Sequence, residues 1–372
     1  MATFFENALL LRGLFTGEKA YVGPYHVTVD VTNRCNMNCL GCRYHSDQVD
    51  FPSQIDTSVS EIPFDLIKRL CADLKIMGTN DIILIGEGEP FLHPHIFDII
   101  SEIKQAGFYL TIVTNGTLLD PDIIEKLIET HADQVIVSLW ASSPEQYCRC
   151  YPGTNPENFD KTVEGLKSFA RIKAESKSKW PLVIIHHVIN RHNYRTIPEM
   201  VELAHETGCD KLNFVPFIAW KGQLRREFVP GDEKAFLNDS LHLAGERLNE
   251  LNIRHNVGDA LLRFQVGEKV WEHLPCYIAW FHARIKLDGT VLPCSPCNLR
   301  MGNVNEKNFP EIWNNEQFRK FRRNTLTREG LSKMGEYVDC GYCCHLVYNA
   351  RIHRIFKWID PVARLFRNGK GD

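Results

Sequence analysis

Residues 29–42 read Val-Asp-Val-Thr-Asn-Arg-Cys-Asn-Met-Asn-Cys-Leu-Gly-Cys and place three cysteines directly after an apolar, strand-like run. Cys35, Cys39 and Cys42 have the spacing C-x3-C-x2-C. Three thiolates in one short loop can hold three irons of a [4Fe–4S] cube and leave the fourth iron without a protein ligand. Zinc is the alternative, because His45 follows at a distance that suits a Cys3His site. The rest of the chain has to decide between the two metals.

The 372-residue chain has the composition of a globular protein, with 44% hydrophobic and 24% charged residues and a formal net charge of −3. This balance gives no reason to expect a nucleic-acid partner. The sequence has no uninterrupted run of about 18 apolar residues that would indicate a transmembrane helix. Residues 1–15 lack the basic start of a secretory signal, so we expect a cytoplasmic protein. Its 13 cysteines then favour metal or redox chemistry over disulfide bonds.

Apolar, β-branched runs alternate with amphipathic helical patterns up to about residue 255. The predicted strands are His26–Asn33, Asp81–Gly86, Tyr109–Asn115, Gln134–Trp140, Leu182–Asn190 and Lys211–Phe217. The predicted helices are 64–77, 96–106, 121–130, 158–174, 196–207 and 233–251. Near-continuous apolar strands separated by helices indicate parallel βα units that are covered on both faces. Right-handed crossovers would curve this sheet into an open, partial (β/α)6 barrel, so the predicted fold class is α/β.

Unusual residues follow four of the predicted strands. The cysteine loop follows the first strand, and Gly86-Glu87-Gly88-Glu89-Pro90 follows the second. Asn115-Gly116-Thr117 follows the third, and Ser138-Leu139-Trp140 ends the fourth. The C-terminal strand ends form the active-site mouth of a βα barrel. Four such segments on one rim indicate a functional site, although a single Gly-Pro or Asn-Gly pair would only mark a turn.

These motifs, in this order and at these strand ends, resemble the radical S-adenosylmethionine (radical SAM) superfamily over about residues 20–255. The resemblance implies that Cys35, Cys39 and Cys42 hold a [4Fe–4S] cluster whose open iron chelates SAM. An electron from the cluster would cleave SAM to methionine and a 5′-deoxyadenosyl radical, which abstracts a substrate hydrogen. A flavodoxin- or ferredoxin-type protein would supply the electron.

The resemblance also implies four contacts to SAM. The backbone around Gly88 and Glu89 should meet the methionine amino group, Ser138 should lie near the ribose, and Arg149 could pair with the carboxylate. The residue before the third cysteine is often aromatic in this superfamily and packs near adenine, whereas here it is Gly41. Adenine stacking would come from elsewhere, and Tyr44 is one candidate.

The C-terminal segment carries a second set of cysteines. Cys276, Gly289-x4-Cys294 and Cys340-x2-Cys343 resemble the SPASM or shorter "twitch" extensions of radical SAM enzymes, which hold auxiliary iron–sulfur clusters. Six thiols cannot close two four-ligand sites, so the resemblance implies one auxiliary [4Fe–4S] cluster. The expected ligands are Cys276, Cys294, Cys340 and Cys343, with Cys297 and Cys344 as spare or substitute ligands. A zinc site formed by Cys294, Cys297, Cys340 and Cys343 is the alternative.

After residue 255 the alternation of strands and helices stops, and cysteine, glycine and proline become more frequent. This change predicts that the chain has three parts. Residues 1–255 form the barrel, with an N-terminal extension at 1–25, and residues 256–350 form a small cysteine-rich domain. Residues 351–372 begin as a basic amphipathic helix, which could touch a membrane surface or dock onto the barrel. On the fifth strand, alternation sends only one of His186 and His187 inward, and a packed histidine is the simpler reading.

The predicted function is a radical SAM oxidoreductase that acts on a small molecule, a carbohydrate or cyclitol alcohol, by dehydrogenation or epimerisation. In a dehydrogenation the auxiliary cluster would accept the second electron. The alternative is a peptide- or protein-modifying maturase, although only some 25 residues precede the first strand. A zinc-binding protein without catalytic activity is the alternative from another class. The sequence singles out no catalytic acid or base.

Overall fold

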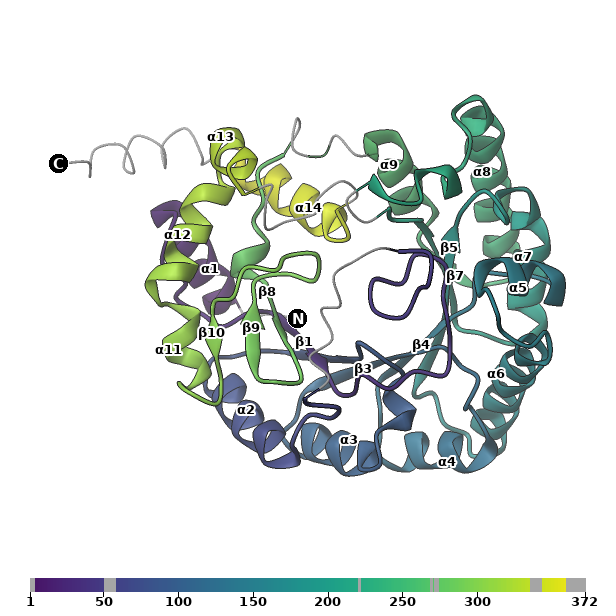
Figure 1. The fold of residues 1–372 in the computed structure, drawn as a ribbon, viewed down its shortest axis with the longest axis horizontal. Coiled ribbons are helices and arrows are strands. Elements are labelled where there is room, and N and C mark those ends of the chain that lie inside the picture. The colour runs from purple at the N-terminus through teal and green to yellow at the C-terminus, as the bar shows by residue number, and fades with distance from the viewer. Residues whose placement is uncertain are drawn as a thin grey trace.

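The computed structural model describes residues 4–49, 58–219, 222–267, 270, 274–334 and 343–358 (Figure 1). Its strands lie in one curved, ten-stranded sheet of order β10-β9-β8-β1-β2-β3-β4-β5-β6-β7. The strands from β8 through β1 to β7 pair in parallel, and β9 and β10 pair antiparallel. The strand bounds are β1 His26–Asp30, β2 Asp81–Ile85, β3 Tyr109–Thr114, β4 Gln134–Ser138, β5 Leu182–Ile189, β6 Lys211–Pro216, β7 Arg254–His255, β8 His282–Ile285, β9 Thr290–Leu292 and β10 Gly302–Asn303.

Helices follow most of the parallel strands and pack along the outside of the sheet (Figure 1). The helices of the barrel are α1 Phe4–Thr16, α2 Phe64–Ile76, α3 Ile96–Gln105, α4 Pro121–Glu129, α5 Pro144–Cys150, α6 Glu157–Glu175, α7 Ile197–Glu206, α8 Lys234–Glu250 and α9 Val257–Val266. Those of the C-terminal segment are α11 Phe309–Trp313, α12 Glu316–Thr325, α13 Arg328–Ser332 and α14 Leu346–Phe356. The local sequence explains where helix α4 begins. The Asp120 side chain accepts a hydrogen bond from Ile123 N, and Pro121 occupies the first turn.

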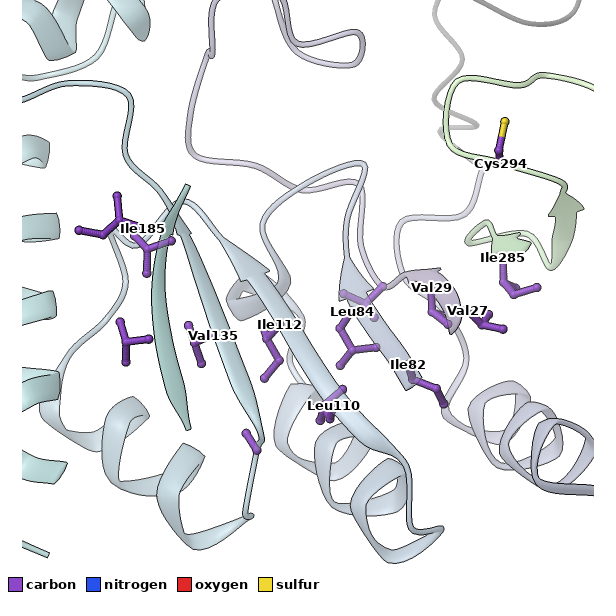
Figure 2. Close-up of a cluster of buried hydrophobic side chains, with 14 of the residues drawn as sticks. Val27, Val29, Ile82, Leu84, Leu110, Ile112, Val135, Ile185, Ile285 and Cys294 are labelled. Carbon is purple, nitrogen blue, oxygen red and sulfur yellow. The ribbon is translucent and has the colours of Figure 1, made fainter. Parts of the chain in front are cut away.

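The two faces of the sheet differ in chemistry because side chains alternate along each strand. The outer face is apolar and packs against the helices; Figure 2 shows Val27, Val29, Ile82, Leu84, Leu110, Ile112, Val135 and Ile185 in this core. The alternate positions face the inside of the curve and include polar residues, namely Thr28, Asp30, Ser138, His186 and Asn213. The curved sheet therefore presents a polar inner surface to the mouth where the motif loops lie.

The C-terminal segment joins the sheet through β8, which lies parallel to β1 with His26 opposite His282 and Val29 opposite Ile285. At the mouth end of this pairing Arg284 donates two hydrogen bonds to Asp30, with Nε to Oδ2 at 2.9 Å and Nη2 to Oδ1 at 2.8 Å. Both side chains are buried. A bidentate pair of this kind fixes the relative height of the two strands.

The N-terminal segment is tied to the C-terminal helices as well. Arg322 on α12 is fully buried and donates to the carbonyl oxygens of Glu18, Ala279 and Trp313. Asn314 exchanges two hydrogen bonds with the backbone of Ala20, each at 3.0 Å. These contacts hold the segment before β1 against α12 and the residues that precede it.

The predicted α/β class and partial barrel are confirmed. All six predicted strands begin at the predicted residue, but each ends one to three residues earlier than predicted. The sequence did not predict β7 to β10, α1, α5 or the short C-terminal helices. The predicted division after residue 350 falls inside α14, and residues 359–372 lie outside the described part of the chain. The domain limits stay a prediction. No helix in the described ranges is both long and apolar enough to cross a bilayer.

Replacing Arg284 by Met should lower the free energy of unfolding by about 3–5 kcal/mol, because Asp30 is left as an unpaired buried carboxylate. The double variant Asp30→Leu/Arg284→Met should recover most of this loss. Urea unfolding under anaerobic conditions measures both values. Arg171→Met is the control, since it removes an exposed ion pair with Glu175 and should leave the midpoint nearly unchanged. Equal urea midpoints for Arg284→Met and the control would show that the buried pair does not stabilise the fold as proposed.

Candidate functional site

The three cysteines of the first motif lie in the loop that follows β1. Backbone hydrogen bonds hold this loop, from Cys42 N to Cys39 O at 3.0 Å and from Leu40 N to Cys150 O at 2.9 Å. All three thiols are close enough to interact electrostatically. Burial raises the pKa of Cys39 well above its ordinary value, and the neighbouring Cys42 and Cys35 raise it further. A thiol with a raised pKa does not ionise readily by itself. A positively charged metal group would stabilise its thiolate form.

The structure does not favour zinc at this loop. His45 donates Nε2–H to the carbonyl oxygen of Glu87 at 2.8 Å, so this nitrogen is committed to the backbone. In the described part of the chain no three His, Cys, Asp or Glu side chains converge on one ion position. Ligands of one zinc ion all lie about 2.0–2.3 Å from the same centre, whereas ligands of a cube bind separate irons and stand farther apart. Three cysteines that do not share one ion position are compatible with ligands of separate irons.

The Gly-Glu-Pro segment packs directly on the cysteine loop. Gly88 N donates to Thr32 O at 2.9 Å, and Glu89 N donates to Arg34 O at 2.8 Å. A Cβ on Gly88 would lie 2.0 Å from Arg34 O, so only glycine permits this approach. The backbone expected to meet SAM therefore lies against the loop that carries the cluster ligands.

The Glu89 side chain has a structural task that the sequence did not reveal. It is buried and accepts hydrogen bonds from Thr114 Oγ1 at 2.7 Å, Asn115 N at 2.7 Å and Phe91 N at 3.2 Å. Burial raises the pKa of the Glu89 carboxyl to about 7, and the hydrogen bonds from Asn115, Thr114 and Phe91 oppose this increase. Glu89 thus joins the loop after β2 to the loop after β3.

The loop after β3 also reaches the cysteine loop. Asn115 Nδ2 donates to Asn36 Oδ1 at 2.8 Å, and Asn36 Nδ2 donates to Thr117 Oγ1 at 2.8 Å. Asn36 lies between the first two motif cysteines. The first three motif segments, distant in the sequence, are therefore hydrogen-bonded to one another at one rim of the sheet.

Ser138 and Arg149 lie at and just beyond the end of β4. The Ser138 carbonyl oxygen accepts a hydrogen bond from Tyr151 Oη at 2.9 Å, and Arg149 occupies the last turn of α5. The roles of both residues toward SAM stay predictions. His187 is packed in the core and donates Nδ1–H to Leu139 O at 3.0 Å, while His186 takes the inner face, as the alternation indicated.

An aromatic ring does lie over Gly41, but it is that of Phe217, just after β6, and not that of Tyr44. A Cβ on Gly41 would lie 2.5 Å from the Phe217 ring, and Gly41 has a φ of +74°. Phe217 therefore occupies the space that an aromatic residue before the third cysteine would fill. Tyr44 instead packs between two guanidinium groups, with its ring centroid 5.3 Å from Arg43 and 5.7 Å from Arg284.

His186 and Asn213 are neighbours in register on β5 and β6 and face the inside of the sheet. Among the described residues, the buried atoms His186 Nδ1 and Asn213 Oδ1 have no hydrogen-bond partner. Burial, together with Arg263, His187 and Lys211, lowers the pKa of His186 to about 4, so the imidazole is neutral near pH 7. Buried polar atoms are usually paired, so two unpaired atoms side by side on the inner face are unusual.

A polar cavity of about 230 Å³ opens beside the third motif cysteine. Its lining is Arg43, Tyr44, Lys286, Asp288, Thr290, Leu292, Asn298 and Arg300. Lys286 pairs with Glu87 at 3.0 Å, so the segment after β8 contacts the Gly-Glu-Pro segment directly. Sequence reasoning missed this contact because neither partner stands out until the two strands are placed together.

The second cysteine set surrounds a small apolar pocket lined by Cys276, Cys294, Cys343 and His345, together with Ile278, Pro296, Phe321, Thr325, Leu331 and Met334. Cys276, Cys294 and Cys343 are buried. Cys340 lies outside the described residues. Cys297 is also buried, and its Sγ accepts a hydrogen bond from Leu299 N at 3.4 Å. Three thiols around one dry pocket fit a closed iron–sulfur site.

Comparison with known proteins agrees with this geometry. The family model described as the radical SAM superfamily matches residues 29–204, and the SPASM model, described as an iron–sulfur cluster-binding domain, matches residues 276–346. The chain is 27% identical over 315 residues to the AdoMet-dependent heme synthase of Methanosarcina barkeri. This match covers 80% of this chain and 85% of the heme synthase. The chain is 26% identical over 310 residues to the PqqA peptide cyclase of Ruegeria pomeroyi, covering 80% of this chain and 75% of that protein.

Solved structures show the same fold. The structure of anSMEcpe with bound AdoMet matches 94% of this chain and 96% of its own, with a TM-score of 0.63 and 17% identity. SuiB of Streptococcus suis bound to S-adenosylmethionine matches 81% of this chain and 68% of its own, with a TM-score of 0.62 and 17% identity. The fold is therefore shared with these solved structures.

Glu89 should make the stability of the protein fall as pH rises from about 4.5 to about 7. The folded state holds the Glu89 proton more tightly than the unfolded chain, so its stabilising effect is complete below pH 4.5 and is lost as pH passes 7. The change is about 3 kcal/mol. Glu89→Gln should remove this slope, as measured by urea unfolding at several pH values. Glu157→Gln, an exposed change at the start of α6, should keep it. Equal slopes for both variants would contradict the assignment.

Proposed function

Because this chain is a radical SAM enzyme that carries a SPASM iron–sulfur domain, we propose that it oxidises a carbon–hydrogen bond of a peptide or protein substrate. Its cofactors are SAM, the [4Fe–4S] cluster that binds SAM and an auxiliary [4Fe–4S] cluster. The observation that carries the proposal is the apolar pocket around Cys276, Cys294 and Cys343. Buried thiols around an apolar pocket are suited to a cluster that transfers electrons.

We assign the ligands residue by residue. Cys35, Cys39 and Cys42 hold the SAM-binding cluster, and Cys276, Cys294, Cys340 and Cys343 hold the auxiliary cluster. The backbone of Gly88 and Glu89, with Ser138 and Arg149, contacts SAM. The close packing of Gly88 on Arg34 supports this assignment, because it holds the Gly-Glu-Pro backbone beside the cysteine loop.

When bound, the SAM cluster supplies a 5′-deoxyadenosyl radical that abstracts hydrogen, and the auxiliary cluster supplies an acceptor for the second electron of an oxidation. The chain's own residues position and enclose the reaction. Glu89 and Asn115 fix the loops around the cysteines, and the buried Lys286–Glu87 pair connects them to the C-terminal segment. The first electron would come from a flavodoxin- or ferredoxin-type protein.

The peptide class is supported by the similarity to PqqA peptide cyclase over most of both chains. A polar cavity and unpaired polar atoms at the inner face suit a substrate with several hydrogen-bonding groups, as a peptide backbone has. His186 is neutral and could accept or donate a hydrogen bond there.

A carbohydrate or cyclitol alcohol is the second candidate, oxidised or epimerised at a carbon that bears a hydroxyl. The observation that favours it is Asn213 Oδ1, an atom buried at the inner face that can accept hydrogen bonds but cannot donate them. A substrate hydroxyl would satisfy this atom.

The membrane contact expected for the C-terminal tail also stays a proposal. Ile355 on α14 and Trp358 just after it are exposed. The basic residues Arg354 and Lys357 directly precede them in the sequence. Apolar groups among basic ones suit an anionic membrane surface.

Replacing Cys35, Cys39 and Cys42 together by Ala should abolish the formation of 5′-deoxyadenosine from SAM with dithionite, because no thiolate remains to hold the open-iron cluster. About four irons per chain should remain after anaerobic reconstitution, held by the C-terminal cysteines. Iron and sulfide analysis and chromatography of the nucleoside measure these outcomes. Cys71→Ala, a change at a buried thiol of α2, should keep both clusters and full cleavage. Persistent reductive cleavage in the triple variant would contradict the ligand assignment.

A panel of peptides should stimulate 5′-deoxyadenosine formation above the substrate-free rate, while a panel of sugars and cyclitols should not. The product should be two hydrogens lighter than the substrate, as mass spectrometry can detect. Stimulation by cyclitols alone would favour the second candidate. Stimulation accompanied by an unchanged product mass would argue against oxidation.

A further inference from the structure

On helix α14, the side chain of Asn349 lies beside two thiols of the auxiliary pocket. Asn349 is buried, and its Nδ2 lies 4.0 Å from Cys276 Sγ and 3.8 Å from Cys343 Sγ. Its Oδ1 accepts a hydrogen bond from Tyr277 N at 2.8 Å. One amide therefore connects two cysteines from separate segments and the backbone beside the first of them.

We propose that Asn349 is a positioning residue that raises the reduction potential of the auxiliary cluster by donating hydrogen bonds to the thiolates of Cys276 and Cys343. The proposal rests on the assignment of these two cysteines as ligands. The relevant couple is the one-electron reduction of the cluster, in which the electron comes from an external donor and no proton or bond changes place.

The orientation of the amide follows from its backbone partner. The N–H of Tyr277 can only donate, so the atom facing it is the amide oxygen. The NH2 group then faces both sulfur atoms and offers each of them one N–H. An inverted amide would place the oxygen against two thiolates and two donors against an N–H, which is unfavourable on both sides.

The charge on the cluster gives the direction of the effect. Reduction adds one negative charge that is shared with the ligand sulfurs, and N–H donors stabilise the more negative form. The pocket is apolar, so little solvent screens this interaction. Arg263 on α9 acts in the same direction, because its Nη2 donates to the carbonyl oxygens of Cys343 and Cys344 at 3.3 and 3.0 Å.

The experiment uses the full chain with both clusters assembled anaerobically. Addition of SAM changes the EPR signal of the cluster with the open iron, so the signal that does not respond to SAM reports the auxiliary cluster. In Asn349→Leu, the ratio of reduced to oxidised auxiliary cluster at a fixed potential should fall about tenfold, which equals about 59 mV for a one-electron couple. Iron content should stay near that of the parent.

Two further variants separate this effect from helix docking. Asn349→Asp keeps an acceptor for Tyr277 N but replaces both donors by a negative charge, so it should lower the potential further. His353→Phe is the matched control on the same helix, because it removes the 2.9 Å hydrogen bond between His353 Nδ1 and Tyr277 Oη without touching a cysteine. Its potential should equal that of the parent.

The outcomes are distinguishable. An unchanged potential in both Asn349 variants would overturn the proposal, and so would an equal shift in His353→Phe. Loss of the auxiliary cluster in both Asn349 variants but not in His353→Phe would show a role in assembly and overturn the tuning role. Cys276→Ser and Cys343→Ser should each lose or alter the SAM-independent signal. If both keep the parent signal, the ligand assignment itself fails, whatever the Asn349 variants show.

Discussion

The pairing of β8 with β1, closed at the mouth by the buried Asp30–Arg284 hydrogen bonds, is the constraint on which the site depends. β1 leads directly into the first cysteine loop. β8 leads through the β9 hairpin to Cys294. Because β1 and β8 are adjacent and in fixed register, the two cysteine sets follow neighbouring strands of one sheet. A change in this register would alter the distance between the two metal sites, even though no ligand had changed.

Most of the barrel could be predicted from the sequence because its strands are long, apolar and separated by amphipathic helices. The starts of the strands were accurate, since each follows a turn and begins a β-branched run. The pairing of β1 with β8 could not be predicted, because β8 is only four residues long and joins a strand more than 250 positions away. Short strands have weak local signals, and their partners are set by tertiary packing.

The motif cysteines were found by their spacing, but the residues that support them were not. Glu89 looked like a possible ligand contact, and the structure shows its carboxylate bonded to Thr114 and Asn115. Phe217 covers Gly41 from the segment after β6, which no local pattern indicates. Asn349 is one asparagine in an otherwise ordinary helix. Such supporting residues are defined by contacts across the fold, and a single sequence contains no record of those contacts.

Arg322 and Asn314 have a consequence for how the chain is made. They bind the backbone of Glu18 and Ala20 across separations of 304 and 294 residues. During synthesis β1 emerges with one edge unpaired, because the β8 residues that cover this edge are translated more than 250 residues later. High contact order of this kind slows folding and leaves the edge open to wrong partners. These contacts can therefore form only after residues 314–322 have been translated and have packed against residues 18–20.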